Sequence, residues 1–208
     1  MINFGNKFGD EISRSMLAED NATPIDILRE LARDKKWRVR VTVAKNPNTP
    51  AEVLLDLARD KEEEIMDAAF WSANMTADVL RELARDKNYY VKVRVSSKPT
   101  TPADALEVLS EDKNKIVRGR VAEHSNTTVE ILENLAKDKD EGIRLAVARN
   151  PNTPVELLEK LSDDKRWKVR EAITKNKNTP TVIIKKLEKD ENKNVRKAVA
   201  SNASSWDL

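Results

Sequence analysis

Arginine and aspartate recur along this chain at a constant spacing, which makes them the first candidates for a chemical role. The arginines are spaced by 26 residues or a multiple of it, with Met66 and Lys92 at the two positions that break the series; they are Arg40, Arg118, Arg144, Arg170 and Arg196. The aspartates follow the same period and are Asp34, Asp60, Asp86, Asp112, Asp138, Asp164 and Asp190. A row of guanidinium groups could bind phosphates, whereas arginines paired with the aspartates would tie neighbouring repeats together. We favour the second interpretation, because a residue found in nearly every repeat is usually required by the repeat itself.

Other catalytic or metal-binding chemistry has little support. The chain has no cysteine and one histidine, His124, so disulfides, thiolate metal sites and His-rich metal cages are excluded. His124 occupies a position where other repeats have asparagine, and we expect a turn residue there. Neighbouring carboxylates such as Asp163 and Asp164 could act in acid–base chemistry, but charged runs on a helical array usually face solvent. We therefore expect no enzyme activity, no cofactor and no small-molecule substrate.

Thr-Pro pairs set the register of the repeat. Thr23, Thr49, Thr101, Thr153 and Thr179 each precede a proline, and successive threonines are 26 or 52 residues apart. This spacing predicts seven tandem repeats of 26 residues over 21–202, numbered 1 to 7 below. Residues 1–20 are expected to form an N-terminal cap with half a repeat, and residues 203–208 a C-terminal cap.

Each repeat is expected to contain two short helices. Thr49 is a candidate N-cap, Pro50 suits the first helical position, and Glu52 would complete a capping box. Leu54 and Leu57 then lie on one face at helical spacing. This pattern predicts a first helix that buries its leucines in a core shared with the neighbouring repeats.

The second helix of each repeat has its own core face and its own stop. In repeat 1, Val39 and Val43 lie on one side of the helix. Asn46 precedes Pro47, and a residue before proline avoids the helical region, so the helix should end there. Asparagine recurs at this position as Asn46, Asn150, Asn176 and Asn202, and we interpret it as a turn residue first and a ligand-binding residue second.

The two ends of the chain carry apolar residues that could cover an open core. Residues 10–20 match a second helix without its first, because Arg14 falls on the position of Arg40 when the register is shifted by one repeat. Ile2, Phe4 and Phe8 precede this half repeat and Trp206 follows the last repeat. A stack of repeats needs such capping at its ends.

The strings NPNTPVELLEKL and RLAVARNPNTP resemble the leucine-rich repeat variant family, and the two-helix pattern also resembles HEAT-like repeats. The resemblance covers residues 21–202. It implies an all-α, right-handed solenoid of two-helix repeats without strands, in which the second helix is α or 3₁₀. It also implies a binding scaffold with no activity that can be transferred. Some members of the family hold an iron–sulfur cluster through cysteines, which this chain lacks.

Residues that could bind a partner are expected on the side of the second helix that faces away from Val39 and Val43. We call the positions equivalent to 37, 41 and 45 in each repeat the outward face; in two-helix solenoids this face commonly lines the concave side. Aromatic residues occur on it in repeats 1, 2, 3 and 6, and exposed aromatics are frequent in binding hot spots; they could also simply pack on their neighbours. The candidate partner-binding residues are Trp37, Val41, Lys45, Trp71, Tyr89, Arg94, Lys115, Arg120, Arg149 and Trp167.

Arg94 and Arg120 suggest a second kind of partner. They replace a small residue in repeats 3 and 4, among several lysines and beside Tyr89 and Tyr90. Cations interleaved with aromatics suit a nucleic-acid groove, and would suit an acidic protein equally well.

The distribution of charge along the chain decides which partner ranks first. Repeat 1 has seven cations and three anions, repeat 2 has two and seven, and repeat 3 has six and three. An acidic repeat between two basic ones would interrupt a phosphate track. We therefore expect a protein-binding scaffold, with duplex DNA binding as the alternative. No segment predicts a membrane span or a signal peptide, and we expect a cytoplasmic location.

Overall fold

The computed structural model describes residues 8–202, with side chains described as far as Ser201. This part of the chain contains fifteen α-helices and no strand. It forms two compact units that divide between Thr100 and Thr101.

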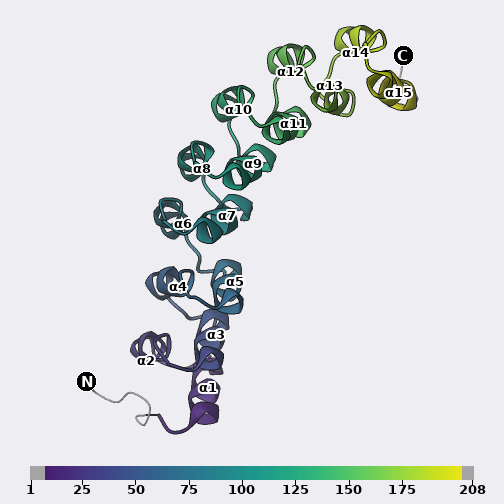
Figure 1. Cartoon of the computed structure of the whole chain (residues 1–208). Helices are drawn as coiled ribbons and strands as arrows, with labels where there is room; N and C mark the ends of the chain where they lie inside the picture. The colour runs from purple at the N-terminus through teal and green to yellow at the C-terminus, as the bar shows by residue number, and fades with distance from the viewer. Residues whose placement is uncertain (1–7, 203–208) are drawn as a thin grey trace. The chain divides into compact units, whose positions relative to one another are not determined.

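The first compact unit, drawn in purple to teal in Figure 1, holds repeats 1 to 3 and the half repeat before them. Its first helices are α2 (Ile25–Leu31), α4 (Ala51–Leu57) and α6 (Ala77–Leu83). Its second helices are α3 (Trp37–Lys45), α5 (Glu63–Trp71) and α7 (Tyr89–Ser97), preceded by α1 (Glu11–Glu19) in the equivalent position. First helices lie on one side of the unit and second helices on the other, and α3 contacts both α1 and α5.

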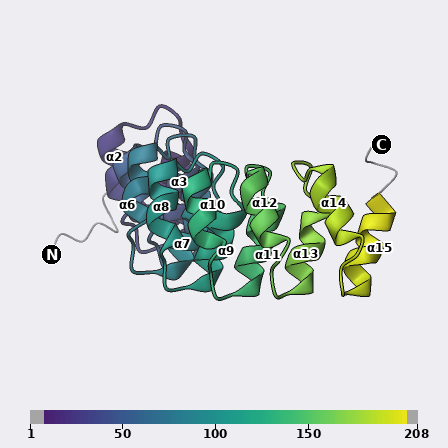
Figure 2. The same cartoon turned by 90° about the horizontal axis from the view of Figure 1, so that it is seen from above.

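The second compact unit repeats this arrangement from Thr101 onward. Its first helices are α8 (Ala103–Ser110), α10 (Val129–Leu135), α12 (Val155–Leu161) and α14 (Thr181–Leu187). Its second helices are α9 (Lys115–Glu123), α11 (Glu141–Arg149), α13 (Trp167–Ile173) and α15 (Lys193–Asn202). Figure 2 shows α11, α13 and α15 following one another, and α13 contacts both of the others.

This architecture confirms the predicted all-α solenoid and agrees with the predicted count of seven repeats. The second helix, left open between α and 3₁₀ by the sequence, is α-helical in the described range. The handedness and the division at residues 20 and 202 stay predictions. Among the predicted capping residues, Ile2, Phe4 and Trp206 lie outside the described residues.

The core runs between the two rows of helices and is built from the same positions in each repeat. Six first helices bury a leucine completely at one such position: Leu28, Leu54, Leu80, Leu106, Leu132 and Leu158. The second helices contribute a β-branched residue that is at most 2% exposed: Val39, Ile65, Val91, Val117, Ile143, Val169 and Val195. Each such side chain contributes about 1.5–3 kcal/mol by leaving water, so the periodic apolar pattern is the main determinant of the fold.

The predicted capping box is wrong. The helix begins at Ala51, Pro50 stands at the N-cap without a side-chain bond, and Glu52 pairs with Arg29. The Thr49 hydroxyl instead donates to the Val43 carbonyl oxygen at the end of the preceding helix. That carbonyl oxygen also accepts from the Asn46 backbone N–H, so the threonine adds a second hydrogen bond at the end of the preceding helix.

Capping by threonine does occur where proline is missing. Thr76 and Thr128 occupy the position of the repeat proline, and their hydroxyls accept from the backbone N–H of Val79 and Ile131. The predicted end of the second helix agrees with the structure, since Asn46 ends α3 in an extended conformation before Pro47.

Candidate functional site

The recurring arginines are structural, and all but Arg196 belong to ion pairs between successive repeats. Arg196, in the last repeat, donates to the Asp190 and Glu191 carbonyl oxygens. Arg40 Nε lies 2.7 Å from Asp60 Oδ2, and the Nη1 group donates to the Asp34 carbonyl oxygen at 2.7 Å. Burial alone would raise the pKa of Asp60, but hydrogen bonds from the Arg40 guanidinium and a backbone N–H outweigh it and lower this pKa. The same contact, twenty residues forward in the chain, is made by Arg14, Arg40, Arg118, Arg144 and Arg170. This confirms the salt-bridge interpretation over a phosphate-binding row.

Repeat 2 replaces this arginine and shows how the pairing is compensated. Met66 is 5% exposed and packs in the core. Asp86, the aspartate that this position would serve, instead accepts from Arg59 Nε at 2.8 Å. The guanidinium of Arg59, which follows the first helix of repeat 2, therefore replaces the missing arginine at the Asp86 carboxylate.

Buried asparagines form a second tie between repeats. Asn150 is 2% exposed, and its Nδ2 group donates to the carbonyl oxygens of Ala122 at 2.7 Å and His124 at 3.1 Å in the preceding repeat. Its Oδ1 atom accepts from the Asn152 backbone N–H at 2.8 Å. Asn46 and Asn176 make the equivalent bonds. The turn interpretation was therefore right but incomplete, because each side chain also holds the neighbouring repeat.

His124 follows the same pattern. It is 7% exposed, and its Nδ1 atom accepts from the Asn126 backbone N–H at 3.0 Å, as the asparagine oxygen does elsewhere. Lys98 occupies this position in repeat 3 and donates to the Phe70 carbonyl oxygen at 2.7 Å. His124 thus occupies the turn position expected from the sequence.

The outward face of the first compact unit carries three exposed aromatics. Trp71 is 79% exposed, Trp37 40% and Tyr89 37%. Arg38 stacks over the Trp37 ring with its guanidinium carbon 5.5 Å from the ring centroid. Lys45 is also exposed.

Val41 was expected on this exposed face, and that expectation is wrong. It is 6% exposed. The helix that carries it, α3, is contacted by α1 on one side and α5 on the other. The middle of its outward face is therefore covered from both sides, while Trp37 and Lys45 at the two ends remain accessible.

The predicted residues of the second compact unit fall into two groups. Lys115 pairs with Asp140 at 3.1 Å, and Arg120 pairs with Glu123 at 3.1 Å. Arg149 is exposed, and Trp167 is half-buried with the Lys168 ammonium 5.9 Å from its ring centroid.

Arg94 is held by the acidic repeat that precedes it. Its Nε atom lies 2.5 Å from Asp67 Oδ1, its Nη2 atom lies 2.7 Å from Glu63 Oε1, and its side chain is 16% exposed. A cation of the basic repeat 3 is thus paired with two carboxylates of the acidic repeat 2. Arg94 and Arg120 also belong to different compact units.

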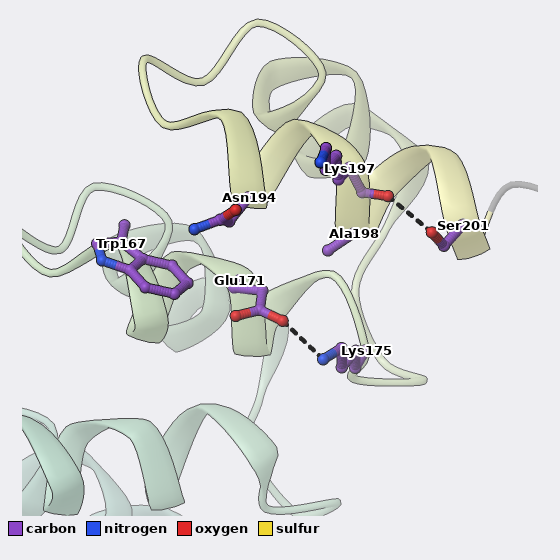
Figure 3. A pocket seen from close by; sticks show the side chains of 7 residues that line it. All are labelled: Trp167, Glu171, Lys175, Asn194, Lys197, Ala198 and Ser201. Carbon is purple, nitrogen blue, oxygen red and sulfur yellow. Dashed lines mark hydrogen bonds and ion pairs between the residues drawn. The ribbon is translucent and has the colours of Figure 1, made fainter.

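Two grooves on the outward face occupy equivalent positions. One, of about 390 Å³, lies between α3 and α5; its lining residues are Ala44, Lys45, Glu64, Asp67, Ala68, Trp71 and Ser72. The other, of about 400 Å³, involves α13 and α15 (Figure 3); its lining residues are Trp167, Glu171, Lys175, Asn194, Lys197, Ala198 and Ser201. Ala68 and Ala198 are the same position of the repeat, five repeats apart, and their small side chains leave the space open.

Sequence reasoning missed these grooves, although the small residue at this position was visible. In α7 the equivalent residue is Arg94, whose guanidinium crosses to Asp67 and Glu63 on α5. The Arg94 side chain thus occupies the equivalent space between α5 and α7. A small residue alone does not open this space, because Ala146 and Ala172 are at the same position and are buried.

Metal and membrane chemistry find no support in the described residues. Within residues 8–202 no group of three or more histidine, cysteine, aspartate or glutamate side chains could hold a metal ion. In that same range, no helix has both the length and the apolar character needed to cross a membrane.

The helices and the two kinds of contact between repeats define a repeat helical scaffold, and comparison with known proteins shows what this scaffold is similar to. The family model described as leucine rich repeat variant matches residues 37–62 and 141–165. Each segment spans the second helix of one repeat and the first helix of the next. A solved structure described as a leucine-rich repeat variant with a novel repetitive motif is 26% identical; the match covers 85% of this chain and 70% of that chain, with a TM-score of 0.64. The predicted resemblance to this family is confirmed.

Two other solved structures are more distant. An engineered protein is 18% identical, with a TM-score of 0.41 over 91% of this chain and 72% of its own. Computationally designed armadillo repeat proteins for modular peptide recognition are 14% identical, with a TM-score of 0.33 over 95% of this chain and 93% of theirs. Neither reaches the similarity of the first. No curated protein matches the chain.

Proposed function

We propose that this chain is a repeat scaffold that binds a protein partner through the outward face of its second helices, the face predicted to be concave. In this proposal the chain acts by recognition, without a reaction of its own. The interaction residues are the exposed members of the predicted set; in the first compact unit they are Trp37, Lys45, Trp71 and Tyr89.

The observation that carries the proposal is the exposure of Trp71. Its side chain is 79% exposed beside the groove between α3 and α5. An indole in water has a large apolar surface that binding would bury, and tryptophan is enriched among residues that dominate interface energies. The groove next to it offers space for a side chain of the partner.

Selection from a random peptide library displayed on phage tests the proposal. Peptides selected on the wild-type protein should bind Trp71→Ala at least about tenfold more weakly, as expected for a hot-spot residue. Val182→Ala is the matched control, because Val182 is 72% exposed but lies on α14, a first helix. Both variants should unfold at the wild-type urea concentration, since neither side chain is buried.

Two results would contradict the proposal. Selected peptides that bind Trp71→Ala as tightly as the wild type would remove this tryptophan from the site. A selection that yields no specific peptide would argue against protein binding altogether.

Nucleic-acid binding is the alternative, favoured by the seven cations and three anions of repeat 7. Titration of a labelled DNA duplex at low and moderate salt separates the two functions. A duplex binder loses affinity steeply as salt rises, because phosphate contacts release counterions. Lys197→Asp in repeat 7 would then weaken duplex binding, whereas a protein binder would respond to Trp71→Ala.

A further inference from the structure

The groove between α13 and α15 combines an indole surface with one cation, Lys197, that has no ion pair with a described residue. Figure 3 shows Trp167 and Glu171 on the α13 side, with Asn194 and Ala198 directed toward them from α15. Lys175 pairs with Glu171 at 2.7 Å. Lys197 forms no ion pair with any described residue and is exposed, so the groove carries one uncompensated positive charge.

The charge beside the groove extends along one side of α15. Lys193 lies four residues before Lys197, on the same side of the helix, and is also exposed without an ion pair to a described residue. Lys197 lines the groove with the Trp167 indole and the Asn194 amide, and Lys193 adds a second ammonium group on the same side of α15. Carboxylates are the side chains that two ammonium groups and an amide donor attract, and an apolar side chain would cover the indole.

We propose that the α13–α15 groove binds an acidic segment of a protein partner, with a carboxylate at Lys197 and an apolar side chain against Trp167. The inference rests on the proposed function, because it names the chemistry of a partner that the scaffold would bind.

An acidic peptide fits this site better than a nucleic acid. Three other cations on or beside the outward face of this compact unit are already neutralised: Lys115 by Asp140, Arg120 by Glu123 and Arg166 by Glu141. Arg149 on α11 is exposed without an ion pair to a described residue. A phosphate backbone needs a continuous row of available cations. At the groove itself the available charge comes from α15, and Arg149 is separated from it by the Lys175–Glu171 pair. This suits a short segment with one or two carboxylates.

The equivalent groove in the first compact unit has the opposite charge at the key position. Asp67 on α5 stands where Lys197 stands on α15, and both line their grooves. The substitution Lys197→Asp therefore places in the α13–α15 groove the same residue type that lines the equivalent groove between α3 and α5. Because the residue is exposed, this substitution should leave the fold intact, which circular dichroism checks.

The test selects random peptides displayed on phage against the wild type and against Lys197→Asp. Peptides selected on the wild type should include a class rich in aspartate and glutamate, and these should bind Lys197→Asp about tenfold more weakly. Selection on Lys197→Asp should instead enrich lysine and arginine. Lys185→Asp is the matched control, since it makes the same charge change on α14 of the same repeat and should bind the acidic peptides normally.

Each other outcome overturns the inference in a recognisable way. If no acidic class appears, or if acidic peptides bind Lys197→Asp as tightly as the wild type, the groove is not their site. If a DNA duplex, and no peptide, depends on Lys197, the site is for nucleic acid. Peptides that depend on Trp71 while none depends on Lys197 would overturn this inference and leave the proposed function standing. The absence of any peptide would overturn both.

Discussion

Replacing Arg144 by methionine tests whether the arginine–aspartate pairs hold the array together. The Arg144 and Asp164 side chains are 6% and 8% exposed, and Nε and Nη2 reach the carboxylate at 2.6 and 3.0 Å. Removing one partner of a buried pair costs about 3–5 kcal/mol, because the remaining charge is left uncompensated. Methionine keeps most of the volume, so little of this cost comes from a cavity. We expect Arg144→Met to destabilise the second compact unit by about 3 kcal/mol.

Repeat 2 supplies the design of a rescue. There, methionine is tolerated because Arg59 reaches Asp86, which lies 27 residues further along the chain. Three repeats later, the position of Arg59 is occupied by Lys137, and that of Asp86 by Asp164. Adding Lys137→Arg to Arg144→Met should therefore recover about 2 kcal/mol, less than the full loss because this guanidinium is more exposed and more screened.

Urea unfolding followed by far-UV circular dichroism gives the free energies for the wild type, both single variants and the double variant. Lys137→Arg alone should change little, so the coupling free energy of the cycle should be about 2 kcal/mol. A cost of Arg144→Met below about 1 kcal/mol would refute the structural importance of the pair. No recovery in the double variant would refute the equivalence of the two arrangements.

Two further predictions concern the same ties. Asn150→Ala should lower the free energy of unfolding in urea by about 3 kcal/mol, because three hydrogen bonds of about 1 kcal/mol each are lost. Asn152→Ala, on the exposed turn, should cost less. Equal costs would contradict the importance of the buried asparagine contact between repeats. Acid should weaken the fold, because the folded-state pKa is lowered at Asp60, Asp138, Asp164 and Asp190. These carboxylates stabilise the protein above their unfolded pKa of about 4, and this stability is lost as pH falls through the lower folded pKa. The urea midpoint should therefore be steady between about pH 7 and pH 5 and fall below about pH 4; a midpoint that does not change down to about pH 3 would contradict this.

Much of the fold could be predicted because the period is visible in single residue types. Leu54 and Val39 mark the core faces of the two helices, and their recurrence sets the length of the repeat. The pairing of arginine with aspartate could also be inferred, because both residues keep the same period.

Contacts that depend on the distance between repeats could not be predicted in this way. Thr49 is a residue type that favours the N-cap of the following helix, but its hydroxyl donates to the Val43 carbonyl oxygen of the preceding helix. Val41 lies on the outward face of an isolated helix, and becomes buried only because α3 has a neighbouring helix on each side.

The candidate site was predicted only in part for a related reason. Charge counted repeat by repeat showed an acidic segment beside a basic one, and this was interpreted as a barrier to an external ligand. In the structure Arg94 pairs with Asp67 and Glu63, so part of that pattern is complementarity within the chain. The exposure of Trp71 and the opening of the grooves depend on the sizes of side chains that come together from different helices. The sequence alone does not show which side chains meet.

The direction of the two ties has a consequence for biosynthesis. Asn150 binds carbonyl oxygens 26 and 28 residues earlier, as Asn46 and Asn176 do, and Arg144 pairs with an aspartate 20 residues later. A repeat within a compact unit is thus complete only once the following repeat has left the ribosome, and it needs nothing beyond that. Because every contact of this kind is short in sequence, each compact unit can assemble in the order of translation, with a single incomplete repeat at the growing end.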